Sequence, residues 1–79
     1  MNEMDYKVRM ADEYRETKHR YNKLHKIIVK HRAGTLDFKL NCPIELLEEQ
    51  ASYMGRYLFV LEVRAEIEDV VLDEGGGDK

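Results

Sequence analysis

Apolar residues recur along the chain at alternating spacings of four and three, the pattern of helices that pack along one seam. One series lies in the first half of the chain and a second, of the same kind, lies in the second half. The members are Met10, Tyr14, Thr17, Tyr21, Leu24 and Ile28, and then Ile44, Leu47, Ala51, Met54, Leu58, Leu61 and Ala65. The pattern predicts an all-α chain in which two helices pair as an antiparallel hairpin.

Glycine and proline mark the ends of these helices. Gly34 follows basic residues, which is typical of a helix C-terminus, and Pro43 precedes Glu45, which is typical of a helix start with proline in the first turn. We therefore predict a hairpin domain over residues 1–70, with helices over about 4–32 and 43–70 and a linker over 33–42. The glycine-rich, acidic residues 71–79 are expected to form a disordered tail.

Two further positions bear on packing. Leu36, Phe38 and Leu40 alternate with polar residues, but no second such segment exists to pair with them as a strand. We expect an extended linker that packs these apolar side chains. Gly55 lies inside the second helical series and is interpreted as a tolerated glycine of the helix interior, with a close helix crossing as the second interpretation.

The second predicted helix also carries a stripe of residues beside its seam. This second stripe consists of Leu46, Gln50, Tyr53, Tyr57, Val60, Arg64 and Ile67. Seam and stripe together cover roughly 200° of the helix, more than one partner helix can bury. We therefore expect the hairpins to assemble into a homo-oligomeric helical bundle. Arg64 then has two interpretations, an ion pair with a glutamate of a neighbouring chain or the lining of an anion pocket at a symmetry axis.

Composition points the same way. A chain of 79 residues has a small core, and its single cysteine, Cys42, excludes an internal disulfide and a multi-thiolate zinc site. Without a disulfide or such a metal site, we expect assembly with other chains to supply the missing stability. For Cys42 itself, at the helix start, we expect a capping or packing role. The first residues include Glu3 and Asp5 and lack an apolar signal segment, so we expect a cytoplasmic protein.

The net charge of −3 hides an asymmetry between the two halves. Residues 1–36 hold nine Lys and Arg against five Asp and Glu, a net charge of +4, whereas residues 37–79 hold four against eleven, a net charge of −7. One interpretation is that these are solvated helix faces that assist pairing, and the other is that the basic half binds a phosphate-bearing ligand.

Catalytic and metal-binding patterns are missing from the sequence. His19, His25 and His31 are six residues apart, which turns them onto different faces of a helix, and the acidic residues of the second half are interpreted as solvated. No glycine-rich phosphate loop or nucleophile motif is present. We expect no enzyme activity, no cofactor and no metal.

Aromatic and basic side chains do alternate along the first helix. Tyr14 and Tyr21 belong to the seam, whereas Tyr6, Arg9 and lysines outside the seam remain for a ligand. Tyrosine offers a stacking face and lysine a charge for phosphate, a combination suited to a nucleotide.

The order of several residues resembles a family of small phage proteins found in crAss-like and many other bacteriophages. The similarity covers about residues 5–68. The first half carries Tyr6-x-x-Arg9-(x)3-Glu13 and Lys23-Leu24; the second carries Leu46-Leu47-x-x-Gln50-(x)3-Met54-x-x-Tyr57-(x)3-Leu61-x-x-Arg64. That family looks related to anti-CBASS sponges, helical hairpins that form hexamers and sequester cyclic oligonucleotide messengers of bacterial immunity. Related hairpin sponges counter Thoeris defence by holding cyclic ADP-ribose-type signals.

The resemblance implies ligand-binding residues. Pockets between protomers would use an aromatic residue near the N-terminus, here Tyr6 with Arg9 beside it, and lysines of the first helix, here Lys23 or Lys26. A second kind of pocket would use Arg64. The long linker over residues 33–42 departs from the family pattern.

Two other classes of function stay open. A structural or protein-interaction helical oligomer of phage or prophage origin needs only the second stripe. Nucleic-acid binding fits the basic first helix but disagrees with the acidic second helix and a pI near 5.6. We expect no association with a membrane, because no apolar run approaches the roughly 20 residues of a membrane span.

Overall fold

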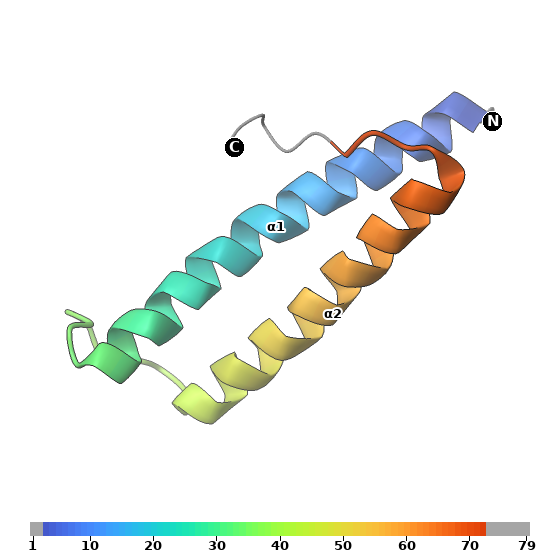
Figure 1. Cartoon of the computed structure of the whole chain (residues 1–79). Coiled ribbons are helices and arrows are strands. Elements are labelled where there is room, and N and C mark those ends of the chain that lie inside the picture. Colours follow the sequence, from blue (N-terminus) through green and yellow to red (C-terminus); the bar gives the residue numbers. More distant parts are fainter. Residues whose placement is uncertain (1–2, 73–79) are drawn as a thin grey trace.

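The computed structural model describes residues 3–72 and consists of two antiparallel α-helices (Figure 1). Helix α1 spans Glu3–Ala33 and helix α2 spans Ile44–Glu68. No strand occurs within residues 3–72, so the predicted all-α class with two helices is confirmed. Neither helix in this part of the chain is long and apolar enough to cross a membrane.

The two helices pack along the predicted seam. Every buried residue that the structure describes belongs to it: Met10, Tyr14, Thr17, Leu58, Leu61 and Ala65. These residues all lie in the half of the hairpin where the start of α1 meets the end of α2 (Figure 1). Toward the linker the seam residues are only half-buried. The core is therefore concentrated at one end of the hairpin.

Three tyrosine–glutamate hydrogen bonds join α1 to α2. The Tyr6 hydroxyl donates to Glu68, that of Tyr14 donates to Glu62 Oε2 at 2.6 Å, and that of Tyr57 donates to Glu13 Oε2 at 3.1 Å. We refer to these three contacts as the tyrosine bridges. Burial, and then the bond to Glu62, raises the pKa of Tyr14, so the hydroxyl stays protonated and keeps donating at neutral pH.

A glycine ends α1 as the sequence predicts. Gly34 has φ of +79°, and the amide of Thr35 donates to Lys30 O at 2.9 Å while that of Gly34 donates to His31 O at 3.1 Å. This pair of backbone bonds is the Schellman motif, which requires a left-handed residue.

The start of α2 differs from the prediction. Pro43 is the extended residue just before the helix rather than part of its first turn, and its carbonyl accepts a bond from the Leu46 amide at 3.1 Å. Cys42 is exposed, and no side chain caps this end, so the expected capping or packing role of Cys42 is wrong. The backbone of Pro43 takes that role because its φ is already fixed.

The end of α2 lies two residues before the predicted one. Asp69 adopts a left-handed conformation with φ of 60°, and the Val70 amide donates to Ala65 O at 2.9 Å. This turn directs the chain back over the hairpin, where Val70 and Leu72 pack against the core. Leu72 is thus part of the packed structure, although the sequence placed it in a tail over residues 71–79; positions 73–79 lie outside the described residues.

The linker and Gly55 complete the fold. A Cβ atom built on Gly55 would lie 3.5 Å from the Tyr21 ring, an ordinary van der Waals contact, so Gly55 is a tolerated glycine of the helix interior and does not mark a close helix crossing. Leu36 and Leu40 are half-buried, as expected for a packed linker. Phe38 instead keeps 54% of its surface exposed, so for this residue the expectation of packing was wrong.

Candidate ligand-binding site

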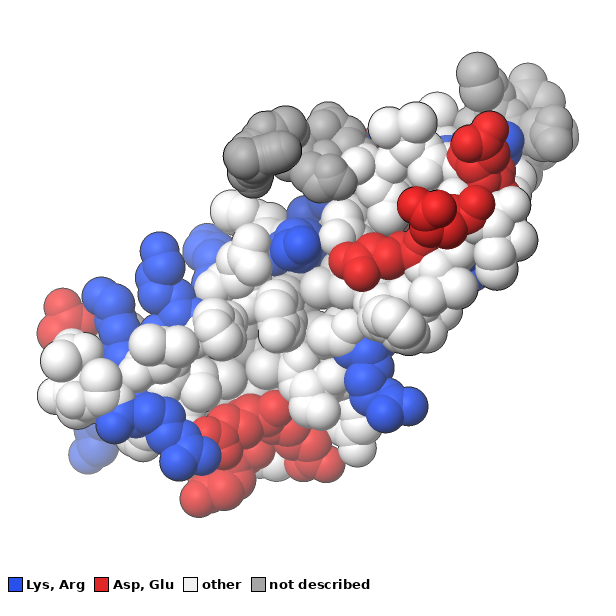
Figure 2. Space-filling model, in the orientation of Figure 1, with Lys and Arg blue, Asp and Glu red and all other residues white. Residues whose placement is uncertain are grey.

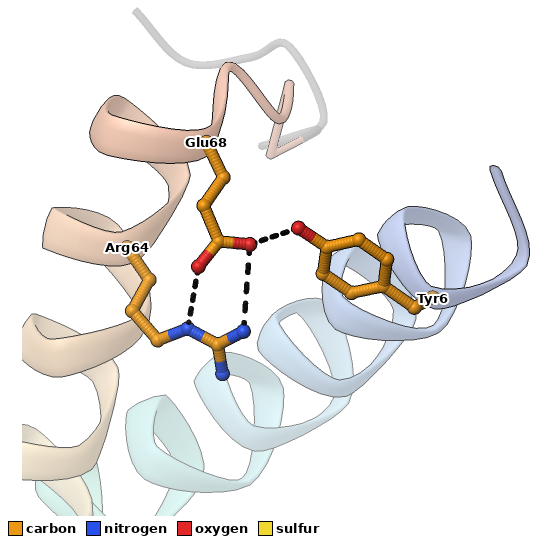
Figure 3. Close-up of polar contacts among 3 residues, drawn as sticks. All are labelled: Tyr6, Arg64 and Glu68. Atoms are coloured by element: carbon orange, nitrogen blue, oxygen red, sulfur yellow. Dashed lines mark hydrogen bonds and ion pairs between the residues drawn. The ribbon is translucent and has the colours of Figure 1, made fainter. Parts of the chain in front are cut away.

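Tyr6 and Arg64, two of the residues implied as ligand-binding, meet through Glu68 (Figure 3). The Tyr6 hydroxyl donates to Glu68 Oε1, and Arg64 donates from Nε to Glu68 Oε2 at 3.0 Å and from Nη2 to Oε1 at 3.5 Å. The Glu68 carboxylate therefore accepts hydrogen bonds from both side chains at once. We call this group the Glu68 cluster.

The Glu68 cluster shows how Arg64 is held within one chain. Its guanidinium pairs with a glutamate of the same helix, four residues on. The Tyr6 hydrogen bond, and then the Arg64 guanidinium, hold the pKa of Glu68 below its ordinary value. The pair is thus ionised at neutral pH, and an anion that binds Arg64 has to share it with Glu68 or displace it.

Glu68 itself was missed by the sequence reasoning, which treated the acidic residues of this segment as solvated charge. The four-residue spacing to Arg64 was a usable signal. The contact with Tyr6 gave no such signal, because it joins residues 62 positions apart in the sequence. Arg9 lies about one turn beyond Tyr6 on α1 and is exposed.

Lys23 and Lys26 line a different feature, a groove of about 470 Å³ between α1 and the linker, which we call the linker groove. Its lining consists of His19, Asn22, Lys23, Lys26, Ile27, Lys30, Leu36, Asp37 and Phe38. The three lysines are spaced by three and four residues and so share one face of α1. Lysine and arginine gather over this end of α1, whereas acidic side chains gather on α2 (Figure 2).

Sequence reasoning assigned no role in ligand binding to Lys30 or to Phe38, which both line the linker groove. The spacing of Lys30 from Lys23 and Lys26 was a signal for the first. No local pattern places Phe38 there, because its position depends on the path that the linker takes around the end of α1.

The structure does not bring all five implied residues together within one chain. Tyr6 and Lys23 are 17 positions apart on one continuous helix, which corresponds to about 25 Å. Tyr6 and Arg64 lie at the end of the hairpin where α1 begins and α2 ends. Lys23 and Lys26 lie toward the linker at the other end (Figure 1).

The second stripe of α2 is uncovered. Its apolar members range from 43% exposed for Tyr57 to 77% for Ile67, and Phe59 and Val63 extend the surface on the same helix. Gln50 and Arg64 are exposed as well. The prediction that α1 alone cannot bury this stripe is confirmed.

The model of the family described as Sequestin matches residues 4–67. The chain belongs to the Sequestin family. No curated protein and no solved structure matches it.

The Sequestin match spans both helices and the linker, and so includes both site regions. Tyr6, Arg9, Lys23, Lys26 and Arg64 all lie inside it, whereas Glu68 lies one position beyond its end. The family name indicates sequestration of a molecule, which agrees with a sponge-type protein.

Proposed function

We propose that this Sequestin-family chain is a phage-encoded sponge that captures a cyclic oligonucleotide or cyclic ADP-ribose-type immune messenger without cleaving it. Membership of the family over residues 4–67 carries the proposal. It acts in the cytoplasm of the host bacterium, where such messengers are made. Capture alone lowers the free messenger concentration by mass action, so the mechanism needs no catalytic group.

The exposed side chains fit such a ligand. Its phosphates need cations, which Lys23 and Lys26 supply, and its bases need apolar or aromatic faces. Arg9 is exposed on the same helix, and Arg64 offers a guanidinium fork that matches phosphate geometry once Glu68 shares or releases it.

A homo-oligomer, with a hexamer as one arrangement, unites the two ends of the hairpin. In an isologous pair whose two-fold axis is perpendicular to the hairpin, each chain runs opposite to its partner, so the Tyr6 end of one hairpin lies near the Lys23 end of the other. The uncovered second stripe supplies apolar surface for such contacts. A messenger then sits between protomers and touches residues that are about 25 Å apart in one chain.

A binding panel tests this function. We expect at least one member of a panel of cyclic dinucleotides, cyclic trinucleotides and cyclic ADP-ribose isomers to raise the melting temperature at tens of micromolar. Chromatography of the heat-released ligand should return it unchanged. No shift with any member would refute sequestration of these messengers, and recovery of a cleaved product would show an enzyme instead.

The alternative is a non-catalytic structural or protein-interaction oligomer. One observation favours it: the apolar surface of α2 is large and needs only protein to cover it. It predicts assemblies of unchanged mass and melting temperature with every nucleotide. Native mass spectrometry of protein purified from a host with active messenger signalling separates the two, because only a sponge retains a ligand.

A further inference from the structure

The linker groove combines features that suit one ligand class. Three lysines share a face of α1, Ile27 and Leu36 form an apolar floor, and the Phe38 ring projects to solvent at 54% exposure. We propose that this groove binds a nucleotide, with Lys23, Lys26 and Lys30 holding its phosphates and Phe38 stacking on its base. The inference rests on the proposed function for its ligand class and assigns the stacking residue to Phe38 rather than to Tyr6.

Charge is the first argument. Among residues 3–72 none of the three lysines forms a salt bridge, whereas three arginines do: Arg15, Arg32 and Arg64. Asp37 is the one acid of the groove lining. The ammonium groups therefore make a local excess of positive charge, which favours a multiply charged anion.

The aromatic ring is the second argument. Tyr6 is half-buried, its hydroxyl is bonded to Glu68, and it lies about 25 Å from Lys23 along α1. Phe38 lies in the same groove as the lysines and has no hydroxyl to satisfy. Exposure of the phenyl ring to water is unfavourable in the free protein. A base stacked on the ring removes that apolar surface from water.

Size is the third argument. Small-ligand pockets enclose about 300–1,000 Å³, and the linker groove, at about 470 Å³, lies inside this range. The linker forms one wall of it, through Leu36, Asp37 and Phe38. The identity of the base that fits is therefore set by residues 36–38.

ADP is a suitable probe, because it carries a base and two phosphates and is not itself a messenger. In a titration of the ¹⁵N-labelled full chain with ADP, we expect amide shifts over residues 19–38. Inorganic pyrophosphate should shift the lysine segment and leave Phe38 nearly unchanged. Shifts that centre on Tyr6 and Arg64 would overturn the assignment.

Variants make the test quantitative. Phe38→Leu should weaken ADP binding about fivefold or more and leave pyrophosphate binding unchanged, because only stacking is lost. Lys30→Gln should weaken both ligands by about threefold or more. Arg20→Gln is the matched control: Arg20 is exposed on α1, carries the same charge and does not line the groove, so binding should stay within about twofold.

The outcomes separate this inference from the proposed function. Equal ADP binding by wild type and Phe38→Leu would refute stacking on Phe38, whatever the messenger panel shows. A panel without hits would refute messenger capture, while groove shifts with ADP would still support the nucleotide site. Circular dichroism of each variant checks that the helices are retained.

Discussion

At the scale of single residues, Glu68 is the carboxylate on which two otherwise separate side chains converge. It accepts hydrogen bonds from Tyr6 on α1 and from Arg64 on its own helix. The contact therefore links the start of α1 to the end of α2, beside the best-buried part of the core. Its charge then contributes to stability in a pH-dependent way.

We predict that Glu68→Gln destabilises the protein at neutral pH and has little effect in acid. Because the folded state lowers the pKa of Glu68, the ionised carboxylate stabilises the fold above its unfolded pKa, which is about 4.3. That contribution is lost as the pH falls through the folded pKa. Urea unfolding of variant and wild type between pH 7 and pH 3 measures the difference.

Glu66→Gln is the control for this experiment, because Glu66 is exposed on the same helix and is not part of the Glu68 cluster. Its stability difference from wild type should stay nearly constant with pH. A Glu68→Gln difference that is as large at pH 3 as at pH 7 would contradict the role of the ionised carboxylate.

Gly34 gives a second prediction at this scale. Its φ of +79° is unfavourable for any residue with a Cβ, although no atom lies within 4 Å of the position that a Cβ would take. Gly34→Ala should therefore lower the free energy of unfolding by about 1 kcal/mol through the backbone alone.

Gly55→Ala serves as the counterpart. Gly55 is helical, and its added Cβ would make an ordinary contact 3.5 Å from the Tyr21 ring, so alanine should stabilise by about 0.5–1 kcal/mol. Denaturant midpoints at one fixed protein concentration test both variants. Equal effects of the same sign at the two glycines would contradict this account.

Gly34 and Glu68 also mark how far sequence reasoning reaches at this scale. The end of α1 was predictable, because basic residues followed by glycine are a local signal. The Glu68 cluster was not, because Tyr6 and Glu68 meet only through the pairing of two helices. A side-chain contact of this kind depends on rotation and offset of the helices, which periodicity leaves open.

At the scale of elements, the heptad spacing predicted which faces of the two helices meet. The buried residues among those described all fall in the predicted seam. The concentration of the core toward one end was not predictable from the spacing, which is equally regular along both helices. It follows from the left-handed turn at Asp69, which brings Val70 and Leu72 over that end as an additional wall.

The seam makes a prediction of its own. Leu61 is 5% exposed and belongs to the core, so Leu61→Ala should lower the free energy of unfolding by about 2–4 kcal/mol. Ser52→Ala, at an exposed position of α2, should stay within about 0.5 kcal/mol of wild type. Urea unfolding tests the pair, and a Leu61→Ala loss no larger than that of Ser52→Ala would contradict a core in this half of the hairpin.

At the scale of the whole molecule, the two candidate ligand regions lie toward opposite ends of an elongated hairpin. The aromatic and basic side chains of the candidate site and the basic character of α1 were predictable from the sequence. The uncovered stripe of α2 was predictable as well. The division of the site into the Glu68 cluster and the linker groove was not, because it depends on the length of α1 and the path of the linker. In the assembly that we propose, the two regions of different protomers come together.

The last prediction concerns that assembly. Val60 lies near the middle of the second stripe and is 50% exposed within one chain. Val60→Glu would bury a carboxylate in a contact made through this stripe, so we expect the oligomer to dissociate toward the 9.4 kDa chain in sedimentation velocity. Messenger affinity should fall with it, because the Glu68 cluster of one protomer no longer lies beside the lysines of another.

Val29→Glu is the matched control, since Val29 is also 50% exposed but lies on α1, outside the stripe. It introduces the same residue and the same charge, so it corrects for surface charge alone. We expect it to keep its mass and its melting temperature. If both variants dissociate alike, or if Val60→Glu keeps its mass, the second stripe of α2 is not the surface that assembles the protein. If Val60→Glu becomes a monomer with undiminished messenger affinity, the site lies within one chain, and the linker groove alone accounts for binding.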